Sequence, residues 1–324
     1  MLLPKRNSQV FWVAAEADAL ATIAGRVPPE FVAQAMPGGK LAPNLARRGI
    51  QGQRNLNPDI GFAYFNMEDP VVGGYTPERV ALRRAIALGY DNRSEIAQIR
   101  NGGIPGQSPV VPHTSGYDPD FKSEMGDFDP VRARALLDLY GYTDRDGDGW
   151  RERPDGSPLR LRMGTQPDQL SRKLTELWKK CMTALGIQIE FAPAQWPENL
   201  KAARAGKLQM WALGSSADKP DGQGGLAKLY SAEIGSQNFA RFVLPEFDAL
   251  YERMRALPDG PERLALFERA KRIAVAYMPY KVTAHRVEAD LLHGWVSGYR
   301  RPLFWLDWWQ MVDVDMARRA AWKP

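Results

Sequence analysis

The chain is poor in the residues that most often carry chemistry. Its 324 residues include one cysteine and three histidines. One thiol cannot form an internal disulfide or a thiolate cage for a metal, so we expect Cys181 to be a small buried hydrophobic residue. The histidines form no HEXXH-like pair, which argues against a zinc hydrolase. The serines lack a GxSxG elbow, and neither a GxGxxG string nor a P-loop occurs.

Long hydrophobic segments are also missing. No apolar run approaches the ~20 residues that a membrane-spanning helix needs. The first nine residues, MLLPKRNSQ, carry two basic side chains but no apolar segment follows, because Glu16 and Asp18 interrupt the next stretch. We therefore expect neither a membrane span nor a secretory signal in this sequence.

The charge is weakly basic and evenly spread. Net charge is +5, from 43 basic and 38 acidic residues, and the basic residues occur in pairs and not in tracts. This pattern is typical of a solvated surface, so we expect no nucleic-acid partner. With 324 residues, the chain is long enough for two domains with a substantial core.

Helical and strand patterns alternate along the chain. Thr76-Pro77 and Asp129-Pro130 each precede a segment with helical spacing of apolar residues, and Gly141 ends the second. A long amphipathic helix is predicted from Thr165 to Leu185. Short apolar or aromatic runs predict strands; these are Gly61 to Met67, Ile187 to Phe191 and Leu208 to Leu213.

The stretch QWPENLKAARAGKLQMWALGSSADKPD, residues 195–221, is the strongest candidate for a site. A helix is expected over Glu198 to Ala205, and a strand bearing Trp211 then runs into a loop with Asp218 and Asp221. A strand followed by a loop and an acid can place a carboxylate at the mouth of a cleft, and indoles supply flat apolar walls. We expect a site that holds a solute; its candidate residues are Asp218, Asp221, Trp211, Trp196, Arg204 and Asn238.

A second acidic segment resembles part of a calcium loop. The string DRDGDGWRERPD places acids at Asp144, Asp146 and Asp148, followed by Gly149. The twelfth residue is Asp155 and not the glutamate that supplies bidentate ligation. Calcium binding is therefore one reading, and a turn closed by its own aspartates is the other.

Several collinear blocks resemble one family. Ala217 to Asp221, VALRRAIALGYD, DPVRARALLDLYGY and NFARFVLPEFDALYERM are similar to segments of the family 5 extracellular solute-binding proteins of ABC importers, the oligopeptide- and dipeptide-binding group. The resemblance extends from about Pro28 to Asp315. In peptide-binding members the loop aspartate pairs with the ligand's α-ammonium, which implies this role for Asp218. The longer spacing from Trp211 leaves Asp221 or Ser215 as alternatives.

The resemblance implies an α/β fold of the type II periplasmic-binding-protein kind, with two lobes of mixed sheets flanked by helices. The N-terminal half of lobe one would be absent. Residues 1–66 would form the lobe-one remnant and first crossover, and residues 67–277 the second lobe. Residues 278–324 would form the second crossover and the return segment of lobe one.

The implied function is that of the substrate-binding component of an ABC transporter. Such a protein is not an enzyme and needs no cofactor, calcium aside. Its partners would be a peptide or other small-molecule ligand and the permease subunits, and it would be a periplasmic monomer. Two alternatives stay open at this point: a glycan-processing enzyme or oligosaccharide-binding receptor, and a truncated fragment that binds nothing.

Overall fold

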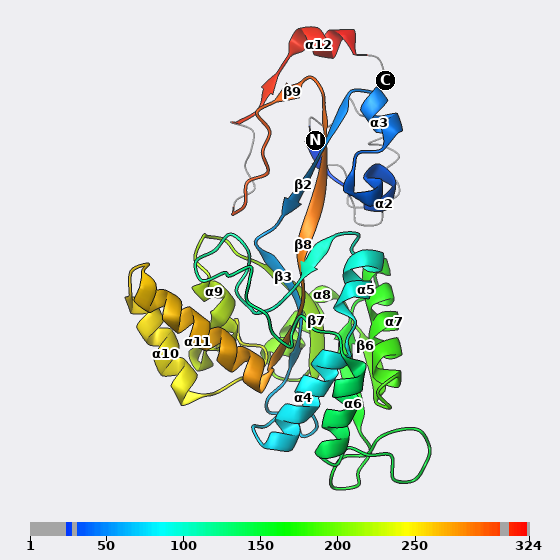
Figure 1. Cartoon of the computed structure of the whole chain (residues 1–324), viewed down its shortest axis with the longest axis vertical. Coiled ribbons are helices and arrows are strands. Elements are labelled where there is room, and N and C mark those ends of the chain that lie inside the picture. Colours follow the sequence, from blue (N-terminus) through cyan, green and yellow to red (C-terminus); the bar gives the residue numbers. More distant parts are fainter. Residues whose placement is uncertain (1–23, 28–30, 305–310, 323–324) are drawn as a thin grey trace. The chain divides into compact units, whose positions relative to one another are not determined.

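The computed structural model describes residues 24–27, 31–304 and 311–322 (Figure 1). The segment on which the expectation of no secretory signal depends, residues 1–21, lies outside the described residues. Among the helices that are described, none has both the length and the apolar character needed to cross a membrane.

The chain divides into two compact units. Unit 1 contains Met1–Asn57, Ala97–Gly103 and Arg286–Pro324, and unit 2 contains Pro58–Ile96 and Ile104–His285. The predicted boundaries, after residues 66 and 277, both fall inside unit 2. They differ because two strands that we assigned to crossovers, β3 (Asp59–Phe65) and the first part of β8 (Tyr280–His293), pair with each other in unit 2.

Unit 1 is built on the second half of β8. The strands β1 (Ala24–Arg26) and β2 (Ile50–Leu56) both pair with this half in antiparallel register. A small core of buried apolar side chains, among them Val32, Leu45 and Ala289, packs beneath them. The other described elements of unit 1 are α2 (Val32–Ala35), η2 (Pro37–Gly39), α3 (Pro43–Arg47), β9 (Val296–Ser297), β10 (Asp313–Val314) and α12 (Met316–Ala321).

Unit 2 contains a mixed sheet. In the order of hydrogen bonding, β3 lies between the first half of β8 and β7 (Met210–Ser216), and is antiparallel to both. Beyond β7 come β5 (Arg160–Thr165) and β6 (Gln188–Pro193), which are parallel to each other. All seven residues of β3 are buried, because the strand is central and both faces of the sheet are covered.

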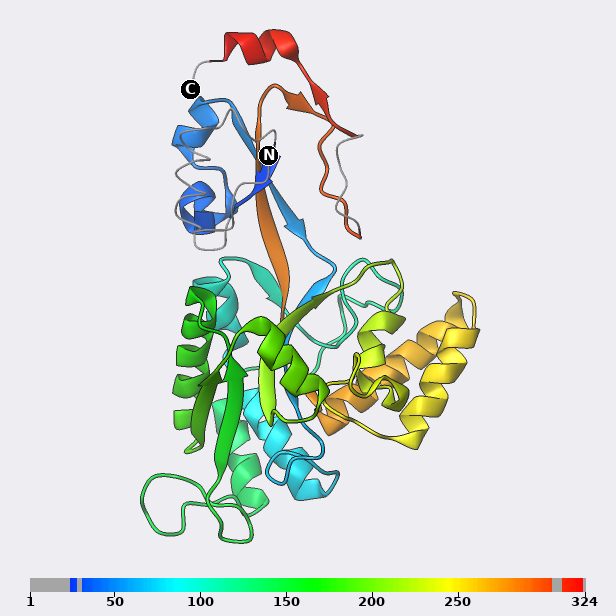
Figure 2. The same ribbon diagram turned by 180° about the vertical axis from the view of Figure 1, so that it is seen from behind.

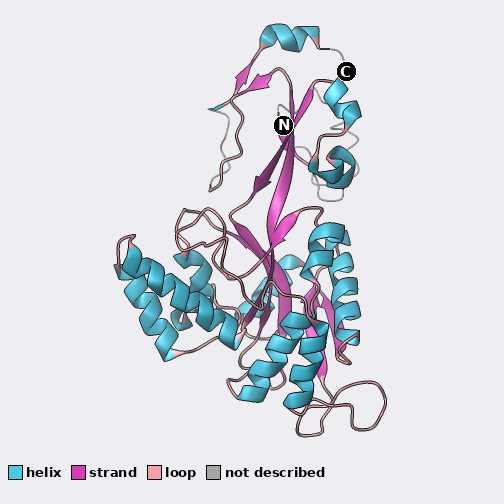
Figure 3. Cartoon of the chain, viewed as in Figure 1, coloured by secondary structure: helices cyan, strands magenta, loops and turns pink. Residues whose placement is uncertain are grey.

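Helices flank this sheet, as the sequence predicts. In Figures 1 and 2, α8 (Trp196–Arg204) lies on one face of the sheet, and α4 (Pro77–Gly89) and α6 (Pro130–Leu139) lie together on the other. Figure 3 shows the strands as a layer between them. The remaining elements of unit 2 are α5 (Asn92–Ser94), α7 (Gln169–Thr183), α9 (Gln223–Leu226), η4 (Ala227–Leu229), η5 (Ser231–Glu233), α10 (Pro245–Ala256) and α11 (Pro261–Tyr277). Two elements contain residues of both units, η3 (Glu95–Ile99) and β4 (Gly103–Pro105).

Capping residues decide where the predicted helices begin. The carboxylate of Asp129 accepts a hydrogen bond from the Arg132 amide at 2.9 Å, which starts α6 where the sequence predicts. Asp168 caps α7 in the same way, so this helix begins four residues after the predicted Thr165. Glu198 accepts from the amide of Gln195 at 2.9 Å, and α8 therefore begins at Trp196, before the predicted Glu198.

Candidate functional site

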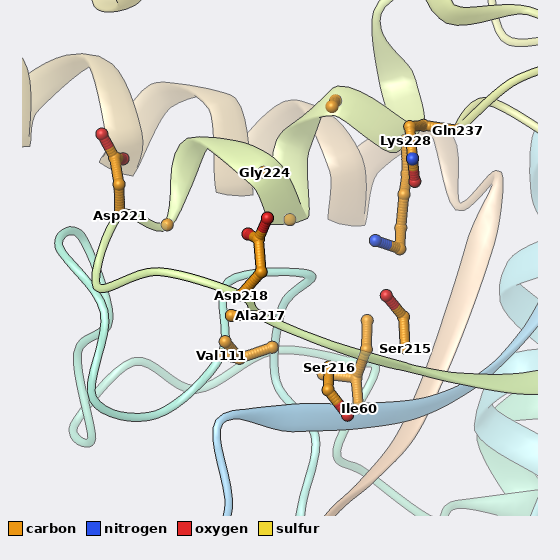
Figure 4. A pocket seen from close by; sticks show the side chains of 13 residues that line it. Ile60, Val111, Ser215, Ser216, Ala217, Asp218, Asp221, Gly224, Lys228 and Gln237 are labelled. Atoms are coloured by element: carbon orange, nitrogen blue, oxygen red, sulfur yellow. The ribbon is translucent and has the colours of Figure 1, made fainter. Parts of the chain in front are cut away.

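A pocket lies where β7 ends. The strand stops at Ser216, and the chain then turns through residues 217–222 into α9 and η4. The turn and the two short helices enclose a pocket of about 380 Å³ within unit 2 (Figure 4). Its lining residues are Ile60, Val111, Ser215, Ser216, Ala217, Asp218, Asp221, Gly222, Gly224, Gly225, Ala227, Lys228 and Gln237.

The two predicted acids behave differently in this pocket. Asp218 is exposed, and within the described residues its carboxylate has no hydrogen bond or ion pair. The carboxylate of Asp221 is 2.8 Å from the guanidinium of Arg263, which is almost fully buried on α11. It also accepts a hydrogen bond from the Gln223 amide at 3.0 Å. Asp221 therefore fixes the loop, whereas Asp218 presents to the pocket a carboxylate that no described residue pairs with.

A buried cation, Lys228, faces the same pocket. Its side chain comes from η4 and is 6% exposed, and its ammonium points into the hollow that Asp218 and Ser215 also face (Figure 4). The Lys228 ammonium stands 5.8 Å from the centre of the Phe62 ring, a cation–π distance. Burial lowers the pKa of Lys228 to about 8, because the charged form loses water contacts.

Close backbone packing shapes the wall between the loop and α9. A Cβ at Gly222 would lie 2.1 Å from the carbonyl oxygen of Ser115, and one at Gly225 would lie 2.4 Å from that of Pro109. The Ser115 amide donates to the Pro220 carbonyl at 3.1 Å. The glycines of GQGG thus let the residues after Asp221 approach the segment 109–115.

The pocket offers several groups that can form hydrogen bonds or ion pairs with a small polar solute. It offers a free carboxylate, an ammonium, the hydroxyls of Ser215 and Ser216 and the amide of Gln237. The lining contains no histidine or cysteine. Its volume lies within the range usual for small-molecule pockets, roughly 300–1,000 Å³.

Comparison with known proteins agrees with this geometry. Residues 14–237 match the family described as "Bacterial extracellular solute-binding proteins, family 5 Middle". The chain belongs to this family. The expected membership is thereby confirmed.

The relatives of this family 5 protein include binding proteins that are named for different ligands. It is 31% identical to "Di/tripeptide-binding protein 2" of Pseudomonas aeruginosa over 68% of its own length and 40% of the relative's. It is 27% identical to "Heme-binding protein A" of Haemophilus influenzae over 81% of its length and 45% of the relative's. The chain thus spans less than half the length of these two relatives.

Solved structures share the fold. The periplasmic binding protein DppA of Helicobacter pylori, in complex with the peptide STSA, superposes with a TM-score of 0.76 at 19% identity, covering 95% of this chain and 55% of that one. The oligopeptide-binding protein AppA of Bacillus subtilis gives a TM-score of 0.73 at 15% identity, with 91% and 56% covered. The expected type II fold, present in part, is confirmed.

Both tryptophans of the candidate set lie away from the pocket of this family 5 chain. Trp211 points from β7 toward α8, is 0% exposed and packs against Trp196 with ring centroids 4.9 Å apart. Trp196 is 43% exposed at the start of α8. The structure differs from the expected indole walls because a strand covered on both faces buries Trp211 in the core.

Arg204 and Asn238 also lie elsewhere. Arg204 is exposed in the last turn of α8, where a cation is stabilised by the helix dipole, and it does not line the pocket. Asn238 is 0% exposed; its amide nitrogen donates to the carbonyls of Tyr230 and Phe242 at 3.0 and 2.9 Å. Its neighbour Gln237 reaches the pocket instead.

The acidic loop gathers a different set of oxygens than its motif predicts. Asp144 and Asp146 come together with Glu152, each offering an oxygen within 4.8 Å of the others. Asp148 accepts from the Trp150 amide at 2.7 Å, and Asp155 accepts from Ser157 at 3.0 Å. Asp144 closes the turn by accepting from the amides of Gly147 and Gly149. The turn is thus closed by its own aspartates, and Asp144, Asp146 and Glu152 also lie close enough together to hold a cation. Calcium binding stays a prediction.

Lys228 is the charged pocket residue that sequence reasoning missed, and Gln237 is a polar one. Lys228 stands between Leu226, Ala227 and Leu229, all buried, in the string GLAKLYS. A lysine inside an apolar run is the one sequence signal that could have indicated a buried cation.

Proposed function

We propose that this chain forms the solute-holding part of an ABC-importer receptor, which captures a peptide or a similar small solute without altering it. The observation that carries the proposal is the Asp218 carboxylate. It lies at the end of β7, lines the pocket and has no partner among the described residues. An α-ammonium is the complementary group, since hydrogen bonds to charged groups contribute about 1.5–3 kcal/mol.

The names of relatives support the choice of solute class. One relative is named for di- and tripeptides and another for heme. A pocket of about 380 Å³ suits one or two amino-acid residues better than a macrocycle. We therefore place peptides first among the solutes.

A glycan-processing enzyme is less well supported. Glycosidases use two carboxylates, one on each side of the scissile bond. Of the two in this pocket, Asp221 is held by Arg263 and by the Gln223 amide, which leaves Asp218 as the acid available to a solute. This distribution of partners favours binding.

The proposal includes the partners and location that go with such a receptor. The loaded protein would deliver its solute to permease subunits on the outer face of the cytoplasmic membrane, as a monomer. The family's description as extracellular supports this location.

Isothermal titration calorimetry on the purified protein tests the ammonium contact. We expect alanyl-alanine amide to bind and its N-acetyl derivative, which has no ammonium, to bind about 10- to 100-fold more weakly. Asp218→Asn should remove that difference, and mass spectrometry should recover the ligand unchanged. Equal binding of the two compounds would refute the proposed contact, and a released product would favour an enzyme.

A further inference from the structure

Lys228 differs from the other buried lysines of the described chain in that its ammonium has neither an anionic partner nor a hydrogen-bond acceptor, only the face of the Phe62 ring. Lys271 lies 3.0 Å from the Glu268 carboxylate, and Lys281 donates to the Met125 carbonyl. Lys228 is as deeply buried as these two, within a few per cent, yet within the described residues it forms no ion pair or hydrogen bond. Burying an ammonium without an anion or a hydrogen-bond acceptor costs folding free energy. A group of the bound solute could supply the missing partner.

The position of the ammonium allows a solute to supply this partner. Lys228 and Asp218 both line the pocket and both direct their charged ends into it (Figure 4). No ion pair joins them, so neither charge cancels the other within the protein. A solute that carries both an ammonium and an anionic group can satisfy the two together, and opposite charges at fixed positions also select its orientation.

We propose that Lys228 binds a carboxylate of the solute, so that the pocket selects compounds in which a carboxylate accompanies the ammonium held by Asp218. This inference rests on the proposed function, because it assumes that Asp218 holds the ammonium. Ser215 and Gln237, which line the same pocket, supply further hydrogen-bond donors to the carboxylate oxygens. With a pKa of about 8, Lys228 is mostly charged at neutral pH.

The carboxylate can come from two sources, the C-terminus of a short peptide or an acidic side chain on its first residue. Four probes distinguish them in calorimetry on the purified protein. The ratio of the affinities of alanyl-alanine and alanyl-alanine amide measures the contribution of a terminal carboxylate. The ratio of the affinities of glutamyl-alanine amide and glutaminyl-alanine amide measures the contribution of a side-chain carboxylate, because the two ligands have nearly the same shape.

In the wild-type protein we expect one of these carboxylates to strengthen binding about 10- to 100-fold over its uncharged counterpart. Lys228→Met, which nearly keeps the length of the side chain and removes its charge, should erase this preference, so that each carboxylate probe binds as strongly as its uncharged counterpart. Lys219→Met is the matched control. It removes one positive charge next to Asp218, but from an exposed residue that does not line the pocket, so the preference should remain.

The outcomes separate the two proposals. If the amides bind but neither carboxylate adds affinity, or if the preference survives Lys228→Met, the role of Lys228 is wrong and the proposed function stands. If none of the four probes binds to the wild-type protein, both proposals fall. A thermal melt of each variant confirms that it is folded before titration.

Discussion

Arg263 holds Asp221 by a contact of 2.8 Å between a guanidinium nitrogen and a carboxylate oxygen, whereas Asp218 has no comparable contact within the described chain. The guanidinium is 6% exposed and also contacts Asp259. Three residues apart in the sequence, the two acids thus have different tasks. One anchors the loop to α11, and the other faces the pocket with no partner among the described residues.

This division predicts unequal effects of two similar substitutions on stability. Asp221→Asn should lower the free energy of unfolding by about 1–3 kcal/mol, because it leaves a nearly buried guanidinium with fewer acceptors. Asp218→Asn should change it by less than about 0.5 kcal/mol, as is usual for exposed side chains. Urea unfolding followed by circular dichroism measures both. Equal losses would show that Asp218 also has a structural partner.

The buried charge of Lys228 predicts a gain in stability from its removal. Folding lowers the pKa of this lysine from its ordinary 10.5 to about 8, so the folded protein disfavours the charged form. Without ligand, Lys228→Met should be more stable than wild type near neutral pH, by on the order of 3 kcal/mol at most. Thermal melts of the two proteins at pH 7 measure the difference.

The lowered pKa of Lys228 also fixes the sign of the pH dependence of folding stability. Between about pH 8 and pH 10 the unfolded state keeps a proton that the folded state has lost, so the destabilisation by Lys228 decreases as the pH rises. The stability advantage of Lys228→Met over wild type should therefore shrink across this range and stay constant below it. An advantage that is independent of pH would point to side-chain packing as its cause.

The glycines after Asp221 give a third prediction. Gly222→Ala should destabilise the protein by about 1–3 kcal/mol, because the new methyl group would overlap the Ser115 carbonyl. Gly224→Ala, two residues further along and inside α9, is the control, since a Cβ there meets nothing within 4 Å, and it should be neutral or slightly stabilising. Denaturant unfolding separates the two. A tolerated Gly222→Ala would mean that segment 109–115 yields at little cost.

The two tryptophans of the candidate set give a fourth prediction. Trp211→Ala should cost about 3–5 kcal/mol of stability, as expected for deletion of a fully buried aromatic side chain. Trp196→Ala should cost much less, because nearly half of that side chain already faces solvent. Neither should alter peptide affinity by much if the protein stays folded, since neither residue lines the pocket. Loss of binding in a folded Trp196→Ala variant would restore the indole as a site residue.

Local signals were sufficient for much of the fold. Thr76-Pro77 and Asp129-Pro130 marked the starts of α4 and α6 correctly, because a proline at the first helical position, and for α6 also the Asp129 cap, act within one turn. The strand carrying Trp211 was also predicted, although it begins at Met210 and continues to Ser216. Its extension follows from pairing with β3, a partner far away in the sequence.

The candidate site was less predictable for the same reason. The loop after β7 could be located, and both of its acids line the pocket. Which acid is free could not be known, because the partner of Asp221 lies on α11, 42 residues along the chain. The burial of Trp211 and of Lys228 depends in the same way on helices and loops that pack over them, which no local pattern reveals.

The strand β8 restricts how this protein can be shortened. Its residues Tyr280 to Ala284 pair with β3 in unit 2, and Val287 to His293 pair with β2 in unit 1. An expression clone that isolates unit 2 must therefore cut through this strand. A cut that removes Tyr280 to Ala284 would leave backbone amides of β3 unpaired along one side, and such an edge invites aggregation. A minimal fragment of unit 2 would need to end after Ala284.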